Sequence, residues 1–349
     1  ATYAGDGEDL DSLYRRLRQA VITGGPAAVI NHRPMAVGIE GLEGSPHGHD
    51  VIPLQRAIDY LERRGHEEAV AVLQAIEKPR NPAVYLGAGE LGSNRNVFGE
   101  AVVKVLDRID PAERKRSVLC VDSDLEGSCG LTAIRKAHPE IFLSGGIMER
   151  ANFSAAAGFG MEKGRQGIFA TFSAFLEMVI SEITMARLNG SNVLCHFSHA
   201  GIDDMADNTC HFGLNNCFAD NGLEEDDPPT RLYFPADASQ MRACVETVFH
   251  QPGLRFLFST RSKVPAMLDP EGKLLYGEGY TFQPGHDELV REGGDGTIVS
   301  FGEALHRCLD AVERLRQEGI ALNLVNKASL NVVDEDMLAR IGTSPFVMV

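Results

Sequence analysis

Four short apolar runs, each followed directly by a polar loop, limit the possible folds of this chain more than any other feature. They cover residues 117–122, 168–170, 192–197 and 255–259. Such runs are typical of parallel strands that are buried on both faces, and the helical segments between them favour crossover connections. The chain is therefore predicted to contain a doubly wound α/β domain with a mostly parallel sheet.

The region before this domain combines a helix with a strand and ends in a linker. Residues 11–21 have apolar side chains four apart, as on one face of an amphipathic helix, and 27–30 is an apolar run typical of a buried strand. This strand–helix–strand arrangement is expected to begin upstream of the first residue. Pro79 and Pro82 indicate a boundary after it.

The last part of the chain starts another α/β unit. Apolar runs at 297–301 and 320–325 flank an amphipathic helix pattern at 303–318. The chain opens without Met and stops before such a unit would be complete, so we expect it to be a piece of a longer multi-domain protein. The predicted domains are 1–80, 81–268 and 290–349.

Composition excludes several classes of protein. A chain of 349 residues with 44% hydrophobic and 23% charged residues is ordinary for globular domains. It has no apolar run of about 18 residues and no secretory signal, so a cytoplasmic protein without a membrane role is expected. The net charge is −16 and the basic residues are scattered, which argues against nucleic-acid partners. Seven cysteines without a CxxC pair are expected to be reduced, buried thiols.

A single acidic side chain, Glu149, lies near the start of a helix built mostly from small residues. Burying a carboxylate is costly unless the group is neutralised, hydrogen-bonded or exposed at the end of an element. One interpretation is an ordinary acid at a helix N-terminus, where the macrodipole favours it. The other is a functional acid, because Phe172 and Phe175 are three residues apart and could together form the wall of an aromatic pocket.

This combination resembles the pyrimidine-binding domain of the transketolase family of thiamine diphosphate enzymes. The resemblance implies that Glu149 hydrogen-bonds the ring nitrogen of the cofactor's aminopyrimidine, while Phe172 and Phe175 stack against the same ring. Met178 would take the place of a third aromatic residue. Asp124 falls where an acidic residue approaches the thiazolium. The fold implied is the thiamine diphosphate-binding fold, with 81–268 as its pyrimidine-binding domain.

The resemblance also covers the flanking regions and the substrate site. Residues 1–80 would be the end of a diphosphate-binding domain with its connecting segment, and 290–349 the start of a C-terminal domain. A set of polar residues matches the family's contacts to sugar phosphate, and it comprises Arg95, Ser128, His199 and Arg261 at the phosphate, and Asp207 and His211 at the sugar hydroxyls and the reacting carbonyl. His47 and His49 lie in a loop that the family places near the substrate channel, or else they are solvated histidines without a role.

Two possible metal sites compete with these matches. Gly5-Asp6-Gly7 followed by Asn31 is similar in wording to the family's magnesium motif, but the resemblance places residues 1–50 after that motif. Magnesium or calcium would therefore be held mainly by residues outside this chain. A zinc site at Cys195, His196, His199, Cys210 and His211 fits poorly, because adjacent residues on a strand point to opposite faces.

The activity implied is transfer of a two-carbon ketol unit between sugar phosphates, as in the pentose phosphate pathway, with Glu149, His211 and His199 as catalytic residues. The cofactor would lie at the interface of a homodimer. The alternatives are another thiamine diphosphate enzyme, namely a phosphoketolase or an oxo-acid dehydrogenase component, or a non-catalytic subunit that needs a separate diphosphate-binding half.

Overall fold

The computed structural model describes residues 1–45, 48, 51–76, 84–201, 211–220, 222 and 227–349. The chain forms two compact units, Ala1–Ala83 and Val84–Val349. The boundary proposed from sequence between 268 and 290 falls inside the second unit, and the three-domain division stays a prediction.

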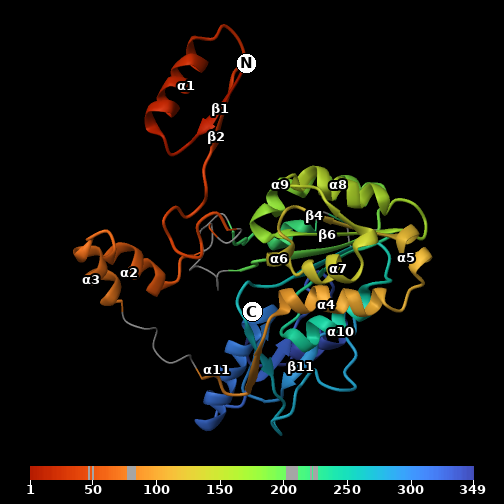
Figure 1. Cartoon of the computed structure of the whole chain (residues 1–349). Coiled ribbons are helices and arrows are strands. Elements are labelled where there is room, and N and C mark those ends of the chain that lie inside the picture. The colour runs from red at the N-terminus through yellow and green to blue at the C-terminus, as the bar shows by residue number, and fades with distance from the viewer. Residues whose placement is uncertain (46–47, 49–50, 77–83, 202–210, 221, 223–226) are drawn as a thin grey trace. The chain divides into compact units, whose positions relative to one another are not determined.

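The first unit contains a parallel pair of strands joined by a helix (Figure 1). β1 (Thr2–Asp6) pairs with β2 (Ala28–His32), and α1 (Leu10–Ile22) connects them. β1 is thus the strand that precedes α1 within this chain. Asp9 caps α1, because its carboxylate accepts a hydrogen bond from a first-turn backbone N at 3.1 Å. No residue of α1 is buried, so its apolar face is exposed. The helices that follow are α2 (Leu54–Glu62) and α3 (Glu67–Gln74).

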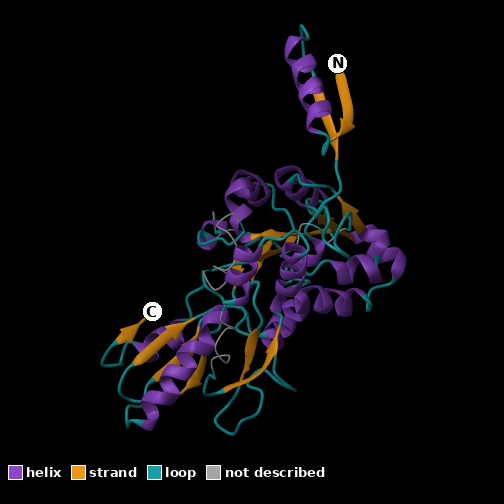
Figure 2. Cartoon of the chain, turned by 60° about the vertical axis from the view of Figure 1, so that its left-hand side comes forward, coloured by secondary structure: helices purple, strands orange, loops and turns teal. Residues whose placement is uncertain are grey.

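The second unit is organised around a six-stranded sheet in which all strands run parallel (Figure 2). Its order is β5-β4-β6-β7-β9-β8. The strands are β4 (Val118–Asp122), β5 (Phe142–Ser144), β6 (Gln166–Phe172), β7 (Val193–Ser198), β8 (Thr230–Tyr233) and β9 (Leu254–Phe258). Each predicted apolar run forms one of these strands, which confirms the predicted doubly wound α/β class.

Helices cover both faces of this sheet (Figure 1). α8 (Glu149–Phe159) and α9 (Leu176–Leu188) lie on one face. The opposite face carries α4 (Asn94–Leu106), α6 (Glu126–Cys129), α7 (Thr132–Ala137) and α10 (Ala238–Val248), and α5 (Pro111–Ser117) leads into β4. Each face has its own apolar core, with Phe98 and Phe249 buried on the α4 side and Phe153 and Phe169 on the α8 side.

Two glycines allow neighbouring elements of the second unit to approach closely. A Cβ added at Gly167 of β6 would lie 2.2 Å from the Ala156 carbonyl O of α8. A Cβ at Gly130, which ends α6 with φ +80°, would lie 1.9 Å from the Arg95 carbonyl O of α4. Because no larger side chain fits either gap, α8 and α4 sit at backbone contact distance from their neighbours.

The remainder of the second unit is a smaller mixed sheet with its own helices. β3 (Ala88–Gly92) pairs antiparallel with β10 (Val264–Met267). A separate sheet has the order β11-β13-β12-β14 and comprises β11 (Glu288–Arg291), β12 (Thr297–Ser300), β13 (Asn323–Asn326) and β14 (Val347–Met348). Its helices are α11 (Leu305–Gln317) and α12 (Glu335–Ile341). β12, α11 and β13 confirm the α/β unit predicted near the end of the chain.

A buried polar cluster attaches this sheet to α10. The Glu288 carboxylate accepts hydrogen bonds from Gln240 Nε2 at 2.9 Å and from the Tyr280 hydroxyl at 2.6 Å, and Asn326 Nδ2 donates to the Tyr276 hydroxyl at 2.9 Å. Burial raises the pKa of Glu288. Apart from Asn326 Oδ1, the polar side-chain atoms of this cluster have partners, so the cluster attaches the smaller sheet to α10 at little cost in unsatisfied hydrogen bonds.

Candidate functional site

Several residues predicted for the site lie at the end of a strand or shortly after one, and the carboxyl ends of these strands meet at one edge of the parallel sheet. Phe172 ends β6, His199 comes directly after β7, and Arg261 comes three residues after β9. In open parallel sheets ligands bind beyond the carboxyl ends of the strands. This edge is therefore the candidate site.

An aromatic cluster forms its centre. The Phe172 ring is stacked on Phe175 with centroids 5.7 Å apart, lies 4.0 Å from the His199 ring, and meets the His211 ring edge-on at 5.2 Å. The two histidine rings are 6.5 Å apart. Phe172 and His199 are buried, while Phe175 and His211 are partly exposed. The structure thus brings together four of the residues predicted from sequence.

Glu149 is the first residue of α8 and comes five residues after Ser144, the last residue of β5. Its side chain is only 5% exposed, and among the residues that the structure describes none donates a hydrogen bond to its carboxylate. β4 separates β5 from β6, so the strand that precedes Glu149 lies about 10 Å from the strand that ends at Phe172. A buried carboxylate without a donor is unfavourable. This one is suited to accept a hydrogen bond from a ligand that occupies the edge.

The loop before Glu149 is held in place by Asn152. Its Nδ2 atom donates to the Ser123 hydroxyl at 3.0 Å and to the Gly146 carbonyl O at 2.9 Å. The Gly145 backbone N donates to the Asp122 carbonyl O at 2.9 Å. These contacts connect the start of α8 to the end of β4, which fixes where Glu149 lies.

Asp122 and Asp124 have different roles in the loop after β4. The Asp122 carboxylate is buried and accepts hydrogen bonds from the backbone N atoms of Asp124 at 3.0 Å and Leu125 at 3.1 Å. Burial raises the pKa of Asp122, although these two bonds act in the opposite direction. Asp124 is exposed and has φ +64°, in the left-handed region. Asp122 therefore shapes the loop and Asp124 extends from it.

Arg95 and Ser128 lie side by side on α4 and α6. The Arg95 guanidinium donates from Nη1 to the Ser128 carbonyl O at 3.0 Å, and both residues are partly exposed. Arg261 is exposed beyond β9, the neighbour of β7. The two arginines predicted to bind phosphate thus belong to segments at the same sheet edge.

Next to the aromatic cluster lies a layer of buried polar residues whose mutual contacts sequence reasoning missed. His196 contacts the Cys129 carbonyl O through Nδ1 at 3.0 Å and the Ser259 hydroxyl through Nε2 at 2.8 Å, and its ring stacks on Phe98. Burial lowers the pKa of His196 to about 3, so this imidazole is neutral at ordinary pH. Ser198 contacts both Cys129 and His199. The available signal was the alternation along β7, which places His196 and Ser198 on one face.

Other predicted residues lie elsewhere. Met178 is on α9 and 47% exposed, and its place in the aromatic pocket stays a prediction. His47, His49 and Asp207 lie outside the described residues. Cys217 is exposed, which corrects the expectation of buried thiols at that position, whereas Cys120, Cys129, Cys195 and Cys244 are buried. No group of three or more potential metal ligands occurs within the described ranges.

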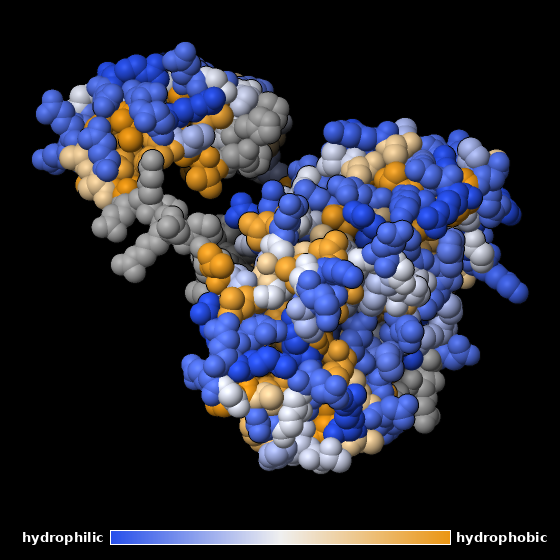
Figure 3. Space-filling view, turned by 90° about the horizontal axis from the view of Figure 1, so that it is seen from below, coloured by the Kyte–Doolittle hydropathy of each residue, from blue (hydrophilic) through white to orange (hydrophobic). Residues whose placement is uncertain are grey.

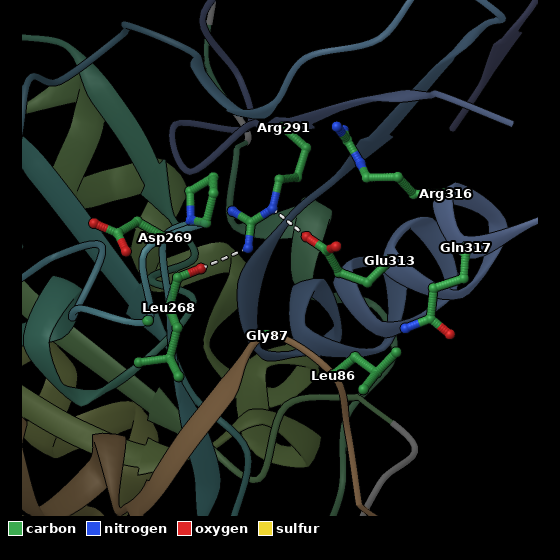
Figure 4. Close-up of a pocket in the computed structure, with 10 residues that line it drawn as sticks. Leu86, Gly87, Leu268, Asp269, Arg291, Glu313, Arg316 and Gln317 are labelled. Carbon is green, nitrogen blue, oxygen red and sulfur yellow. Dashed lines mark hydrogen bonds and ion pairs between the residues drawn. The ribbon is translucent and has the colours of Figure 1, made fainter. Parts of the chain in front are cut away.

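A hollow of about 490 Å³ between β10, β11 and α11 is a poorer candidate (Figure 4). Its central cation, Arg291, forms an ion pair with Glu313 and donates to the carbonyl O atoms of Leu268 at 2.7 Å and Val290 at 2.9 Å. All three donor groups of this guanidinium are engaged by the protein. The hollow therefore offers no ready anion-binding cation at its centre, and it lies away from the ends of the parallel strands.

Hydrophilic residues predominate on the face that Figure 3 shows, and apolar residues occur there in small groups. Of the helices in the described part of the chain, none has the length and apolar character needed to span a bilayer.

Comparisons with known proteins match both parts of the second unit. Residues 93–267 match the family model for the transketolase pyrimidine binding domain, and residues 285–347 match that for the transketolase C-terminal domain. Transketolase-like protein 2 of Mus musculus and transketolase of Homo sapiens are each 23% identical to this chain, over 95% of its length and 53% of theirs. The chain thus spans about half the length of these curated relatives.

Solved structures show the same fold. A split gene transketolase, described as an inactive beta4 tetramer, has a TM-score of 0.59 and 27% identity, covering 74% of this chain and 78% of that one. Transketolase from Campylobacter jejuni has a TM-score of 0.58 and 18% identity, covering 99% and 59%. Transketolase from Pichia stipitis in complex with sedoheptulose-7-phosphate has a TM-score of 0.57 and 15% identity, covering 100% and 60%.

Proposed function

Because this chain belongs to the transketolase family, we propose that it provides the pyrimidine-binding half of a thiamine diphosphate site that transfers a two-carbon ketol unit from a ketose phosphate to an aldose phosphate. One observation supports this proposal most strongly. Glu149 is only 5% exposed, its carboxylate has no donor among the described residues, and it lies at the same sheet edge as the Phe172 cluster. A hydrogen-bonding acid beside an aromatic wall suits a planar ring that carries nitrogen.

The residues present fit this cofactor at its pyrimidine end. Glu149 would accept or share the proton of a ring nitrogen, while Phe172 and Phe175 would contact the face of the ring. When bound, thiamine diphosphate supplies a thiazolium carbon that can hold the electron pair released as a carbon–carbon bond breaks. Asp124 would approach that end. Magnesium or calcium would be bound mainly by residues beyond this chain.

The remaining polar residues suit the substrate. Arg95, Ser128 and Arg261 would hold the phosphate, and a guanidinium gives charge-assisted hydrogen bonds to phosphate oxygens. His199 and His211, which share the aromatic cluster, would donate hydrogen bonds and transfer protons at the sugar. Asp207, His47 and His49 stay predicted substrate contacts.

Arg261→Ala is expected to raise the apparent Kd for sedoheptulose-7-phosphate about ten- to a hundredfold, because one charge-assisted contact contributes roughly 1.5–3 kcal/mol. Binding can be measured by calorimetry on the assembled protein. Lys263→Ala is a matched control, since Lys263 is an exposed cation two residues away. Equal losses in both variants, or an equal loss for unphosphorylated sedoheptulose, would show that Arg261 does not bind phosphate.

The proposed homodimer is supported by the two faces of α8. Asn152, Phe153, Ala156 and Ala157 face the sheet and are buried. The opposite face carries Ala151, Ser154, Ala155 and Gly158, which are exposed. Small side chains on an exposed helix face permit close approach of a second helix. We therefore propose that α8 packs against its own copy, which would place a diphosphate-binding region of one subunit beside the pyrimidine pocket of the other.

Ala155→Glu is expected to convert a dimer into a monomer, because it places an unpaired charge at the centre of this contact. Light scattering of the assembled protein with thiamine diphosphate and magnesium measures the mass directly. Ala339→Glu makes the same change on an exposed face of α12 and should leave the dimer intact. A dimer that tolerates Ala155→Glu would place the interface elsewhere.

A second candidate function is that of a subunit that is inactive alone and completes its site with a separate diphosphate-binding chain. It is favoured by the exposed apolar face of α1, which the first unit itself leaves uncovered. The matched split gene structure is also described as an inactive tetramer of its beta chain. Thiamine diphosphate binding by the chain, with and without an added diphosphate-binding half, separates the two functions.

A further inference from the structure

Three buried side chains form a hydrogen-bonded chain behind the aromatic cluster. The Cys129 Sγ atom lies 3.3 Å from the Ser198 Oγ atom, which lies 2.9 Å from Nδ1 of His199. All three residues are buried, at 0%, 0% and 2% exposure. Cys129 belongs to α6, Ser198 ends β7, and His199 follows Ser198. The hydrogen bonds between them therefore connect α6 to the end of β7.

The direction of these hydrogen bonds follows from the chemistry of the three groups. Burial raises the pKa of Cys129 to about 12, so the thiol keeps its proton and can donate toward Ser198 Oγ. The Ser198 hydroxyl has one proton and two possible acceptors. A neutral imidazole nitrogen is a much better acceptor than a thiol sulfur. The hydroxyl therefore donates to Nδ1, and the ring proton of neutral His199 is placed on Nε2.

The ring of His199 is also held from its other side. Its centroid lies 4.0 Å from that of Phe172, at an angle of 39° between the ring planes. The backbone of His199 has φ +59°, an uncommon conformation for a residue other than glycine, which the surrounding packing maintains. The Phe172 contact thus holds the ring plane, and the Ser198 contact favours one position of the ring proton.

We propose that Ser198 is a positioning residue that fixes neutral His199 as the Nε2–H tautomer, so that the nitrogen remote from Ser198 is a hydrogen-bond donor. The role of this Nε2–H donor rests on the proposed function, in which it donates a hydrogen bond to an oxygen of the sugar phosphate. The tautomer itself does not depend on the ligand. The reverse arrangement, in which Nδ1–H donates to Ser198 and Ser198 donates to sulfur, would instead make Nε2 an acceptor.

The tautomer can be measured by long-range ¹H–¹⁵N spectra of the full chain labelled with ¹⁵N-histidine, with the His199 signals assigned by their loss in His199→Gln. The expected result is a protonated-type shift for Nε2 and an unprotonated-type shift for Nδ1. Cys129→Ala should preserve this pattern, since the hydroxyl donor remains. Ser198→Ala should give a mixture of tautomers. A protonated Nδ1 in the unmodified protein overturns the proposal, and so does an unchanged spectrum in Ser198→Ala.

Binding of sedoheptulose-7-phosphate by the assembled protein gives a second readout. Ser198→Ala should raise the apparent Kd about tenfold, as for loss of one oriented hydrogen bond, and Ser198→Thr, which keeps the hydroxyl, should restore most of the affinity. Circular dichroism checks that each variant is folded. Normal affinity in folded Ser198→Ala contradicts the positioning role. If the unmodified protein binds no sugar phosphate, the proposed function fails while the tautomer measurement still stands.

Discussion

Glu149→Gln is expected to lower the rate of two-carbon transfer by about 10²- to 10⁴-fold, the range contributed by a positioned acid–base group. The amide has nearly the same shape as the carboxylate, so the buried start of α8 should keep its packing. It cannot exchange a proton with a ring nitrogen in the way that a carboxyl group can. We therefore expect thermal stability and much of the cofactor binding to remain while turnover falls. Steady-state kinetics and thermal melting on the same preparations measure both.

Glu162→Gln is the matched control, because Glu162 is exposed just beyond the opposite end of α8 and forms an ion pair with Arg165 on the surface. Its rate should stay close to that of the unmodified protein. Near-normal turnover in Glu149→Gln would remove Glu149 from the mechanism. A large fall in thermal stability would instead assign it a structural role at the start of the helix.

Gly130→Ala is expected to reduce the free energy of unfolding of the second unit by about 3 kcal/mol or more. A left-handed backbone costs roughly 1–2 kcal/mol for a residue with a Cβ, and overpacking adds about 1–3 kcal/mol. Both apply, since Gly130 has φ +80° and the added Cβ would lie 1.9 Å from the Arg95 carbonyl O. The shift needed to relieve this clash would also move Arg95 relative to Ser128. Urea denaturation followed by circular dichroism measures the loss.

Gly127→Ala gives the same chemical change three residues earlier with the opposite expectation. Gly127 is in α6, and a Cβ there would meet nothing within 4 Å. Alanine is favoured over glycine in helices by roughly 0.5–1 kcal/mol, so stability should stay equal or rise slightly. If both variants lose a similar amount of stability, the loss in Gly130→Ala does not come from its contact with α4.

The sheet could be predicted from sequence because its strands are apolar on both faces and helices separate them. That pattern requires only local information, and it places residues such as Phe172 and His199 at one edge through topology alone. The pairing of β3 with β10 could not be predicted in this way, because it joins segments far apart in the chain. β1 was missed as well, since its residues, apart from Tyr3, are small or polar and give no strong apolar signal.

The site was predictable where residue type alone indicates chemistry. A lone Glu149 near two phenylalanines stands out in a sequence, but Ser198 and Cys129 do not, because small polar residues in strands are usually inert and their importance depends on three-dimensional contacts. The small residues of α8 were ambiguous for a similar reason. Composition cannot tell which of them face the sheet, and the structure shows that Ala156 does while Ala155 does not.

The most direct test of the central claim is a crystal structure of the assembled protein with thiamine diphosphate and magnesium bound. The distance to measure is that from the Glu149 carboxylate to the ring nitrogen of the aminopyrimidine. We predict a short hydrogen bond of about 2.5–3.0 Å, with the ring lying against Phe172 and Phe175. A pyrimidine ring bound elsewhere, with the Glu149 carboxylate still lacking a partner, would contradict it.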